Sequence, residues 1–204
     1  MSWRHTCRIR HLASNARFVK LLSVLDAYRP GSDEELRDVQ RVRELARSGD
    51  AWSRSLPVHV TGSAVVVHPP TRRVLLRWHE RMQGWLQVGG HADPGEVDPY
   101  AIALREAREE TGLEDLVPWP VADEPRVMQV AIVPVPAGKG EPFHHHADIR
   151  YALATATPER IRAESDTAHL AWLSIDEALR LVGQDNLRTC LGRIEALFAR
   201  EVSA

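Results

Sequence analysis

The feature that most constrains this chain is a glycine-rich turn followed directly by a strongly acidic helix, in the stretch GGHADPGEVDPYAIALREAREETGL at residues 89–113. Asp98 can cap free backbone N–H groups, and Pro99 has no N–H to leave unpaired at the first helical position, so we expect a helix to begin there. Gly112 is placed to end it. Helical periodicity puts three glutamates on one face, namely Glu106, Glu109 and Glu110.

Three carboxylates on one stripe of a helix repel one another, which weakens an isolated helix. A hard divalent cation offsets this repulsion, because Mg²⁺ prefers carboxylate and water oxygens and commonly shares its shell with substrate phosphates. Such a metal can neutralise a diphosphate and activate or orient a water molecule. For the helix alone, the plainer interpretation is a solvated acidic face balanced by Arg105 and Arg108.

The wider segment resembles the Nudix box, the signature motif of the Nudix hydrolases. That pattern is a Gly, five residues, a Glu, seven residues, then Arg-Glu, an aliphatic residue, any residue, Glu-Glu, any residue, Gly and an aliphatic residue. The matching positions are Gly90, Glu96, Arg105, Glu106, Glu109, Glu110, Gly112 and Leu113. Two departures stand out: one extra residue lies before Arg105, which we place near Val97 in the turn, and the aliphatic position holds Ala107.

The resemblance implies a Mg²⁺ or Mn²⁺ site. Its ligands would be the three helix glutamates and the backbone carbonyl of Gly90, which makes them the expected catalytic centre. Glu96 and Arg105 would brace the loop against the helix. In some Nudix enzymes the general base lies on a later loop, and the candidates here are Glu164 and Asp166, just before the predicted strand HLAWLSI.

Candidates for substrate contact lie outside the motif. His146 and Asp148 share one face of a predicted strand with His144, and three interpretations stay open: a metal site, a polar pocket wall, or hydrogen bonds to the leaving group. Arg77 could grip a phosphate, and Tyr151 could stack on a nucleobase, although an aromatic residue in a strand is more often part of the core.

Hydrophobic periodicity predicts an α/β (α+β) chain, and the resemblance implies the Nudix fold, a mixed β-sheet sandwiched between helices. Residues 1–56 form a helical extension with an N-terminal helical hairpin over 16–28 and 33–49, whose second helix carries Leu36, Val39, Val42 and Leu45 as its apolar positions. Residues 57–204 form the Nudix hydrolase domain. Strands are expected over 57–69, 72–78, 84–90, 126–135, 143–155 and 169–175, and closing helices over 176–181 and 186–202.

Composition excludes several partners. The net charge is −2, so no basic field favours nucleic acid, and no apolar run approaches the roughly 20 residues that a membrane helix needs. The two cysteines, Cys7 and Cys190, form no disulfide or zinc pattern, which fits a reducing cytoplasm. The N-terminal hairpin is expected to serve in packing, possible homodimer formation or, less favoured, as a lid over the substrate.

These features predict a Mg²⁺-dependent hydrolase that cleaves a diphosphate linkage in a nucleoside diphosphate derivative or nucleoside triphosphate. The alternative is a catalytically weak Nudix-fold module that binds a ligand or regulates. An isopentenyl diphosphate isomerase shares the fold but needs a cysteine on a core strand, and neither cysteine is placed there. No secondary signature in the sequence identifies the diphosphate substrate.

Overall fold

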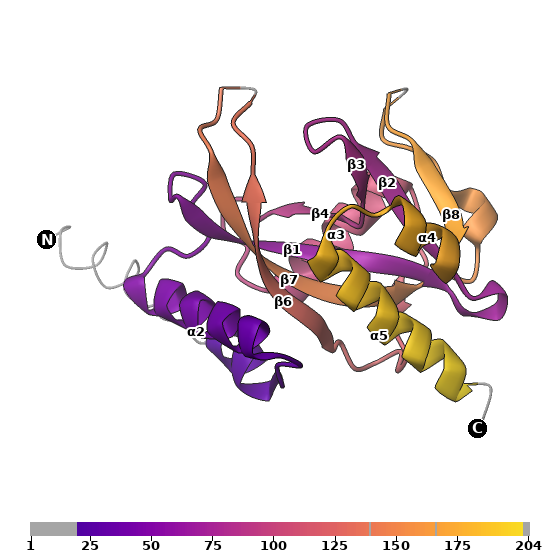
Figure 1. The fold of residues 1–204 in the computed structure, drawn as a ribbon, viewed down its shortest axis with the longest axis horizontal. Coiled ribbons are helices and arrows are strands. Elements are labelled where there is room, and N and C mark those ends of the chain that lie inside the picture. The colour runs from indigo at the N-terminus through magenta and orange to yellow at the C-terminus, as the bar shows by residue number, and fades with distance from the viewer. Residues whose placement is uncertain (1–19, 139, 166, 202–204) are drawn as a thin grey trace, which may run out of the picture.

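The long strand β1 (Val58–His68) is the centre of the fold (Figure 1). The structure is a computed structural model and describes residues 20–138, 140–165 and 167–201. β1 pairs in parallel with β7 (His144–Ala154) along one edge. Along its other edge it pairs antiparallel with β4 (Val88–His91) and then with β2 (Arg73–His79).

The remaining strands join β2 and β7. β3 (Gly84–Leu86) and β8 (Leu170–Ser174) pair with β2, and β5 (Val117–Pro118) and β6 (Val127–Val135) pair with β7, all antiparallel. Two single turns of 3-10 helix, η1 (Pro69–Thr71) and η2 (Pro158–Arg160), lie in the connections. The result is one eight-stranded sheet. The prediction of a mixed sheet is confirmed.

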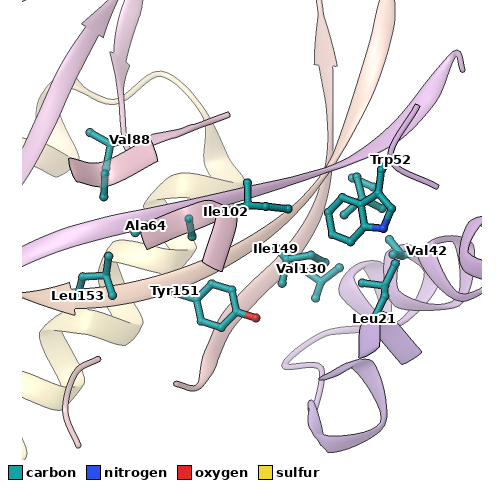
Figure 2. Close-up of a cluster of buried hydrophobic side chains, with 14 of the residues drawn as sticks. Leu21, Val42, Trp52, Ala64, Val88, Ile102, Val130, Ile149, Tyr151 and Leu153 are labelled. Carbon is teal, nitrogen blue, oxygen red and sulfur yellow. The ribbon is translucent and has the colours of Figure 1, made fainter. Parts of the chain in front are cut away.

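Both faces of β1 are covered, which explains its nearly continuous apolar sequence. Ala64 and Val66 belong to one core cluster, whereas Val65 and Val67 belong to a second cluster on the opposite face of the sheet. Figure 2 shows the first cluster, in which side chains from the sheet meet Ile102 of the acidic helix and Leu21 and Val42 of the N-terminal helices.

The acidic helix α3 (Pro99–Thr111) covers the first face and has the predicted ends. The Asp98 side chain accepts a hydrogen bond from the backbone N–H of Tyr100, and Gly112 closes the helix in the left-handed region at φ 67°. The side of α3 that faces the sheet buries Ile102, Ala103 and Ala107. The predicted helix is confirmed.

The closing helices α4 (Ile175–Leu181) and α5 (Asp185–Glu201) pack on the second face. Leu187, Leu191 and Ile194 of α5 pack with Val65 and Val67 of β1 in the second core cluster. The sheet therefore lies between α3 on one face and α4 with α5 on the other, and the predicted sandwich is confirmed (Figure 1).

The N-terminal helices are present, but the buried face of the second one includes only some of its apolar positions. Residues 20–27 are helical, and α2 runs over Asp33–Ser48 with Ser32 as its N-cap. Leu36 is 44% exposed and Leu45 only half-buried. The buried residues of α2 are Glu35, Val39, Val42 and Ala46. Glu35 is on the buried face because it is hydrogen-bonded to Arg193 inside the fold. Hydrophobic periodicity cannot predict the burial of a charged residue.

Carboxylates of α2 cover the edge of the sheet at β6. The backbone N–H of Val130 donates to Glu35 (3.3 Å), and that of Ile132 donates to Asp38 (3.0 Å). Arg193 of α5 donates to both oxygens of Glu35, at 2.9 and 2.7 Å. An exposed edge strand is a template for unwanted pairing, so α2 both shields this edge and ties it to α5.

One strand predicted from the sequence is divided into two in the structure. The sequence predicted a single strand over residues 84–90, whereas the structure has β3 paired with β2 and β4 paired with β1, with Gln87 between them. The short strand β5 was not predicted. The basic segment at residues 1–17 and the first part of the predicted N-terminal helix lie outside the described residues. Among those described, no helix is long and apolar enough to span a bilayer.

Gly62 offers a test of the contact between β1 and α3. A Cβ atom at this position would lie 2.5 Å from the carbonyl oxygen of Pro99 and 3.0 Å from the backbone N of Ala103, and backbone atoms cannot move aside cheaply. We expect Gly62→Ala to lower the free energy of unfolding by about 1–3 kcal/mol, the usual range for overpacking. Urea unfolding measures the change.

Gly192→Ala is the matched control for this substitution. Gly192 lies inside α5, and a Cβ atom there would have nothing within 4 Å, so the substitution should stabilise the helix by up to about 1 kcal/mol. Equal effects of the two substitutions would contradict the close approach of β1 and α3.

Candidate active site

The three glutamates of α3 differ in their surroundings. Glu110 is buried, at 8% exposure, and accepts a hydrogen bond from the backbone N–H of Gly89 (3.0 Å). The side chain of Glu106 is mostly buried, at 16% exposure, whereas that of Glu109 is 56% exposed. The carboxylates therefore form a stripe that runs from the glycine pair out to solvent.

Arg105 holds these carboxylates and the preceding loop together. Its Nε and Nη2 donate to the two oxygens of Glu96, at 3.0 and 2.9 Å. Its Nη1 donates to Glu106 and to Glu109, both at 2.9 Å, and Nη2 also donates to the carbonyl of His91 (2.8 Å). The extra residue near Val97 is absorbed before the helix begins, because Glu96 still reaches Arg105 with both oxygens.

The glycine pair allows β4 to lie directly over the carboxylates. A Cβ atom on Gly90 would lie 2.5 Å from the carboxyl carbon of Glu106. Gly89 has φ 150°, and a Cβ there would lie 2.3 Å from the Cβ of Ser63 on β1. Gly89 is therefore required by both close packing and conformation, whereas a side chain at Gly90 would displace the carboxylate of Glu106.

Burial changes the acidity of the inner carboxyls. Loss of solvent raises the pKa of Glu110 to about 7, although Arg77 and the N–H of Gly89 act in the opposite direction. Burial also raises the pKa of Glu106, against the effect of Arg105. Without a bound cation, burial in the fold therefore disfavours the ionised form of both carboxyls.

Arg77 and Glu164 meet at the inner end of the stripe. Arg77, on β2, lies 3.0 Å from Glu110 and also donates a hydrogen bond to Glu164. The structure thus brings both predicted residues beside the buried glutamate, with Arg77 paired to two carboxylates. Asp166, the other predicted base, lies outside the described residues.

A pocket opens at the glycine pair, and a buried polar network forms part of its wall. Asp148 of β7 accepts hydrogen bonds from Thr61 (3.1 Å), Ser63 (2.8 Å), Gln87 (3.0 Å) and Arg150 (2.9 Å). All five residues line the pocket together with Gly89, Gly90 and His146. The predicted pair His146 and Asp148 is therefore close to the motif, as part of a network whose other members were not predicted.

Tyr151 is not brought into this pocket. It lies on the opposite face of β7, where it is 2% exposed and belongs to the first core cluster (Figure 2). Its ring also packs against that of Tyr100 of α3. Successive side chains of a strand point to opposite faces, so Tyr151 and Asp148, three positions apart, cannot share one. Tyr151 is a core residue, which was the alternative interpretation from the sequence.

Four histidines gather at one end of the pocket, and the sequence predicted only two of them as neighbours. His144 and His146 of β7 meet His59 of β1 and His91 of β4. Burial lowers the pKa of His91 to about 3 and that of His146 to about 4, so both rings are neutral at neutral pH. No local spacing connects His59 or His91 with β7; only the pairing of the strands does.

Comparison with known proteins identifies the family. A family model, the NUDIX domain, matches residues 58–191, so the chain belongs to the Nudix family and is a Nudix hydrolase. No curated protein matches the sequence. The matched range begins at β1 and ends within α5, and it contains all the candidate residues of the site.

Solved structures share the fold. A Caenorhabditis elegans Ap4A hydrolase in a binary complex is 18% identical, with a TM-score of 0.55 over 69% of this chain and 98% of that one. The Escherichia coli dihydroneopterin triphosphate pyrophosphohydrolase is 19% identical, with a TM-score of 0.50 over 71% and 97%. A Nudix-family hydrolase from Clostridium perfringens is 23% identical, with a TM-score of 0.50 over 68% and 97%.

The raised pKa of Glu110 predicts a pH-dependent stability of the metal-free protein. A carboxyl whose folded pKa of about 7 lies above the unfolded value contributes stability at low pH that is lost as the pH rises through 7. We expect this group to lower the free energy of unfolding by about 3 kcal/mol between pH 4 and pH 8. Glu110→Gln should remove that loss.

Urea unfolding in the presence of a chelator, at both pH values, measures the difference. The control is Glu195→Gln at an exposed position on α5. This variant should show the same change in the free energy of unfolding between pH 4 and pH 8 as wild type. The same pH dependence in wild type and in Glu110→Gln would show that Glu110 does not carry it.

Proposed function

We propose that this Nudix hydrolase uses Mg²⁺ or Mn²⁺ to cleave a diphosphate linkage in a nucleoside diphosphate derivative or nucleoside triphosphate. One observation carries the proposal: Glu106 and Glu110 of α3 lie directly against a glycine pair that lines a pocket, and Glu109 continues the carboxylate stripe to solvent. A substrate phosphate in that pocket would therefore meet the carboxylate stripe at Gly90.

The residues fit a hard divalent cation. The donor set consists of carboxylate oxygens from Glu106, Glu109 and Glu110, which Mg²⁺ and Mn²⁺ prefer, and we propose the carbonyl of Gly90 as a further ligand. Because Gly90 has no side chain, the backbone of β4 lies close to the Glu106 carboxylate. When bound, such an ion neutralises charge on the diphosphate and makes water a better nucleophile.

Arg105 and Glu96 act as positioning residues in this proposal. The bonds from Arg105 to two of the glutamates reduce their mutual repulsion, and its bidentate bond to Glu96 fixes the loop that follows β4. The carboxylates are thus held in place before substrate arrives, which lowers the reorganisation needed for reaction.

Glu164 is our proposed general base. It reaches the carboxylate stripe through Arg77, and its side chain is 39% exposed, so a water molecule can approach it. Arg77 would bind a substrate phosphate in place of one of its carboxylate partners, and this exchange would free Glu164 to accept a proton.

Unpaired polar atoms support a substrate-binding role for the pocket. Among the described residues, Nη2 of Arg81 and Oε1 of Gln87 are buried without a hydrogen-bond partner, and both residues line the pocket. Buried polar atoms are costly unless paired, so a donor and an acceptor held in this way suit a polar ligand. With His146 they are our candidates for substrate contact. Asp148, whose oxygens are occupied by Thr61, Ser63, Gln87 and Arg150, would act in substrate binding by positioning Gln87.

The named relatives are consistent with this substrate class. Ap4A and dihydroneopterin triphosphate, which the names of two structural relatives mention, both contain phosphate anhydride bonds. We therefore propose a small-molecule nucleotide or related diphosphate as the substrate. The cytoplasmic location and the homodimer stay predictions from the sequence, as does the division at residue 57.

The central test is metal-dependent turnover. We expect hydrolysis of at least one compound from a panel of nucleoside diphosphate derivatives and triphosphates with Mg²⁺ or Mn²⁺, and a fall of about 100-fold or more in kcat/KM for Glu109→Gln and Glu110→Gln. The control is again Glu195→Gln. Product analysis by anion-exchange chromatography measures both rate and cleavage position. Ligand binding without turnover of any compound would favour the regulatory module instead.

Glu164→Gln tests the assignment of the base. Loss of a general base typically lowers kcat by about 100-fold or more, and the limb of the pH–rate profile that reports this base should disappear while KM changes little. Glu159→Gln, an exposed position in η2 on the same connection, is the control. An unchanged kcat in Glu164→Gln would remove Glu164 from the mechanism.

A further inference from the structure

A compact histidine cluster lies beside the proposed catalytic site. One ring nitrogen from each of its four members lies within 4.8 Å of every other, and the members are His59, His91, His144 and His146. His59 and His144 are buried, at 1% and 6% exposure. The proposed function leaves the cluster as a whole unexplained, although two of its members line the pocket.

The sheet places all four imidazoles on one face. His59 and His146 are register partners in the parallel pair β1 and β7, and His144 precedes His146 by two positions, so its side chain points the same way. β4 adds His91 opposite Thr61, two positions after His59. Three strands that are distant in sequence therefore deliver the rings to one point.

Backbone carbonyls orient two of these rings. Nδ1 of His59 lies 3.0 Å from the carbonyl oxygen of Leu56, and Nδ1 of His144 lies 2.8 Å from that of Pro142. A carbonyl can only accept, so Nδ1 donates in both rings, and Nε2 is the nitrogen left to face an ion. This arrangement is the one that fixes metal-ligating histidines, with the outer nitrogen bonded to a backbone carbonyl.

We propose that the four histidines bind one first-row transition ion of the Zn²⁺ class. Four nitrogens at about 2.0–2.1 Å from a tetrahedral Zn²⁺ lie about 3.3 Å from one another. The observed Nε2 to Nε2 separations of 3.0 Å for His59 with His91 and 3.1 Å for His144 with His146 are close to that value. The other separations, all within 4.8 Å, would have to shorten toward this value when the ion binds.

The chemistry of the ligands separates this site from the carboxylate stripe. Neutral imidazole suits zinc, copper, iron and nickel, whereas Mg²⁺ selects oxygen ligands. Asp148 is not available as a fifth ligand, because Thr61, Ser63, Gln87 and Arg150 already occupy its oxygens. Four protein ligands with no open position are typical of a structural ion rather than a catalytic one.

Such an ion would fix the strand that carries the glycine pair. His91 follows Gly90 directly, and its carbonyl accepts a hydrogen bond from Arg105 at 2.8 Å. Binding His91 to β1 and β7 through the ion would hold the end of β4 over the carboxylates. The site therefore stabilises the sheet independently of whether the proposed reaction takes place.

Zinc binding to the full chain tests the proposal. After removal of metals with a chelator, calorimetric titration with Zn²⁺ in excess Mg²⁺ should give one tight equivalent per chain. Free Zn²⁺ at about 100 times Kd should raise Tm by about 5–10 °C. His59→Gln and His144→Gln should lose both effects. His145→Gln, on the same strand but on its opposite face, and Glu109→Gln should keep them.

X-ray absorption at the zinc edge of the wild-type protein tests the ligand set without any substitution. We expect four nitrogen neighbours at about 2.0–2.1 Å with the outer-shell scattering of imidazole. The proposal is overturned if wild type binds no Zn²⁺ in excess Mg²⁺, or if the bound Zn²⁺ has carboxylate ligands. The rings would then be only two hydrogen-bonded pairs, a state that their present separations also allow.

Discussion

The site depends on the guanidinium of Arg105. Its five N–H donors bind Glu96, Glu106, Glu109 and the carbonyl of His91, so a single side chain joins the helix, the loop before it and the end of β4. Without this cation, like charges on one helical face would repel and the loop would have no fixed partner. Glu110 is the one glutamate of the stripe that Arg105 does not bind; Gly89 and Arg77 hold it instead.

The glycine pair converts that arrangement into an accessible site. Because Gly89 and Gly90 have no side chains, β4 approaches both β1 and the carboxylate of Glu106. The same close approach buries Glu110 and raises its pKa to about 7. The fold thus tolerates an unfavourable carboxylate where a divalent cation would be useful, a conflict between stability and function that is common at active sites.

Much of the fold could be predicted because its signals are local. The cap at Asp98, the proline after it and Gly112 define α3, and the apolar run of β1 identifies a strand covered on both faces. The failures arose where tertiary bonds override local pattern. The ion pair with Arg193 offsets the cost of burying Glu35, so the buried face of α2 includes Glu35 while Leu36 stays exposed.

The sequence by itself determined the carboxylate stripe, because residues three and four apart on a helix share a face wherever the helix packs. Only the tertiary structure decided what the strands contribute. Tyr151 went to the core and Asp148 to the pocket, since register and alternation assign each side chain its face. His59 and His91 met the histidines of β7 for the same reason, because strand pairing brings together residues that no spacing in the sequence connects.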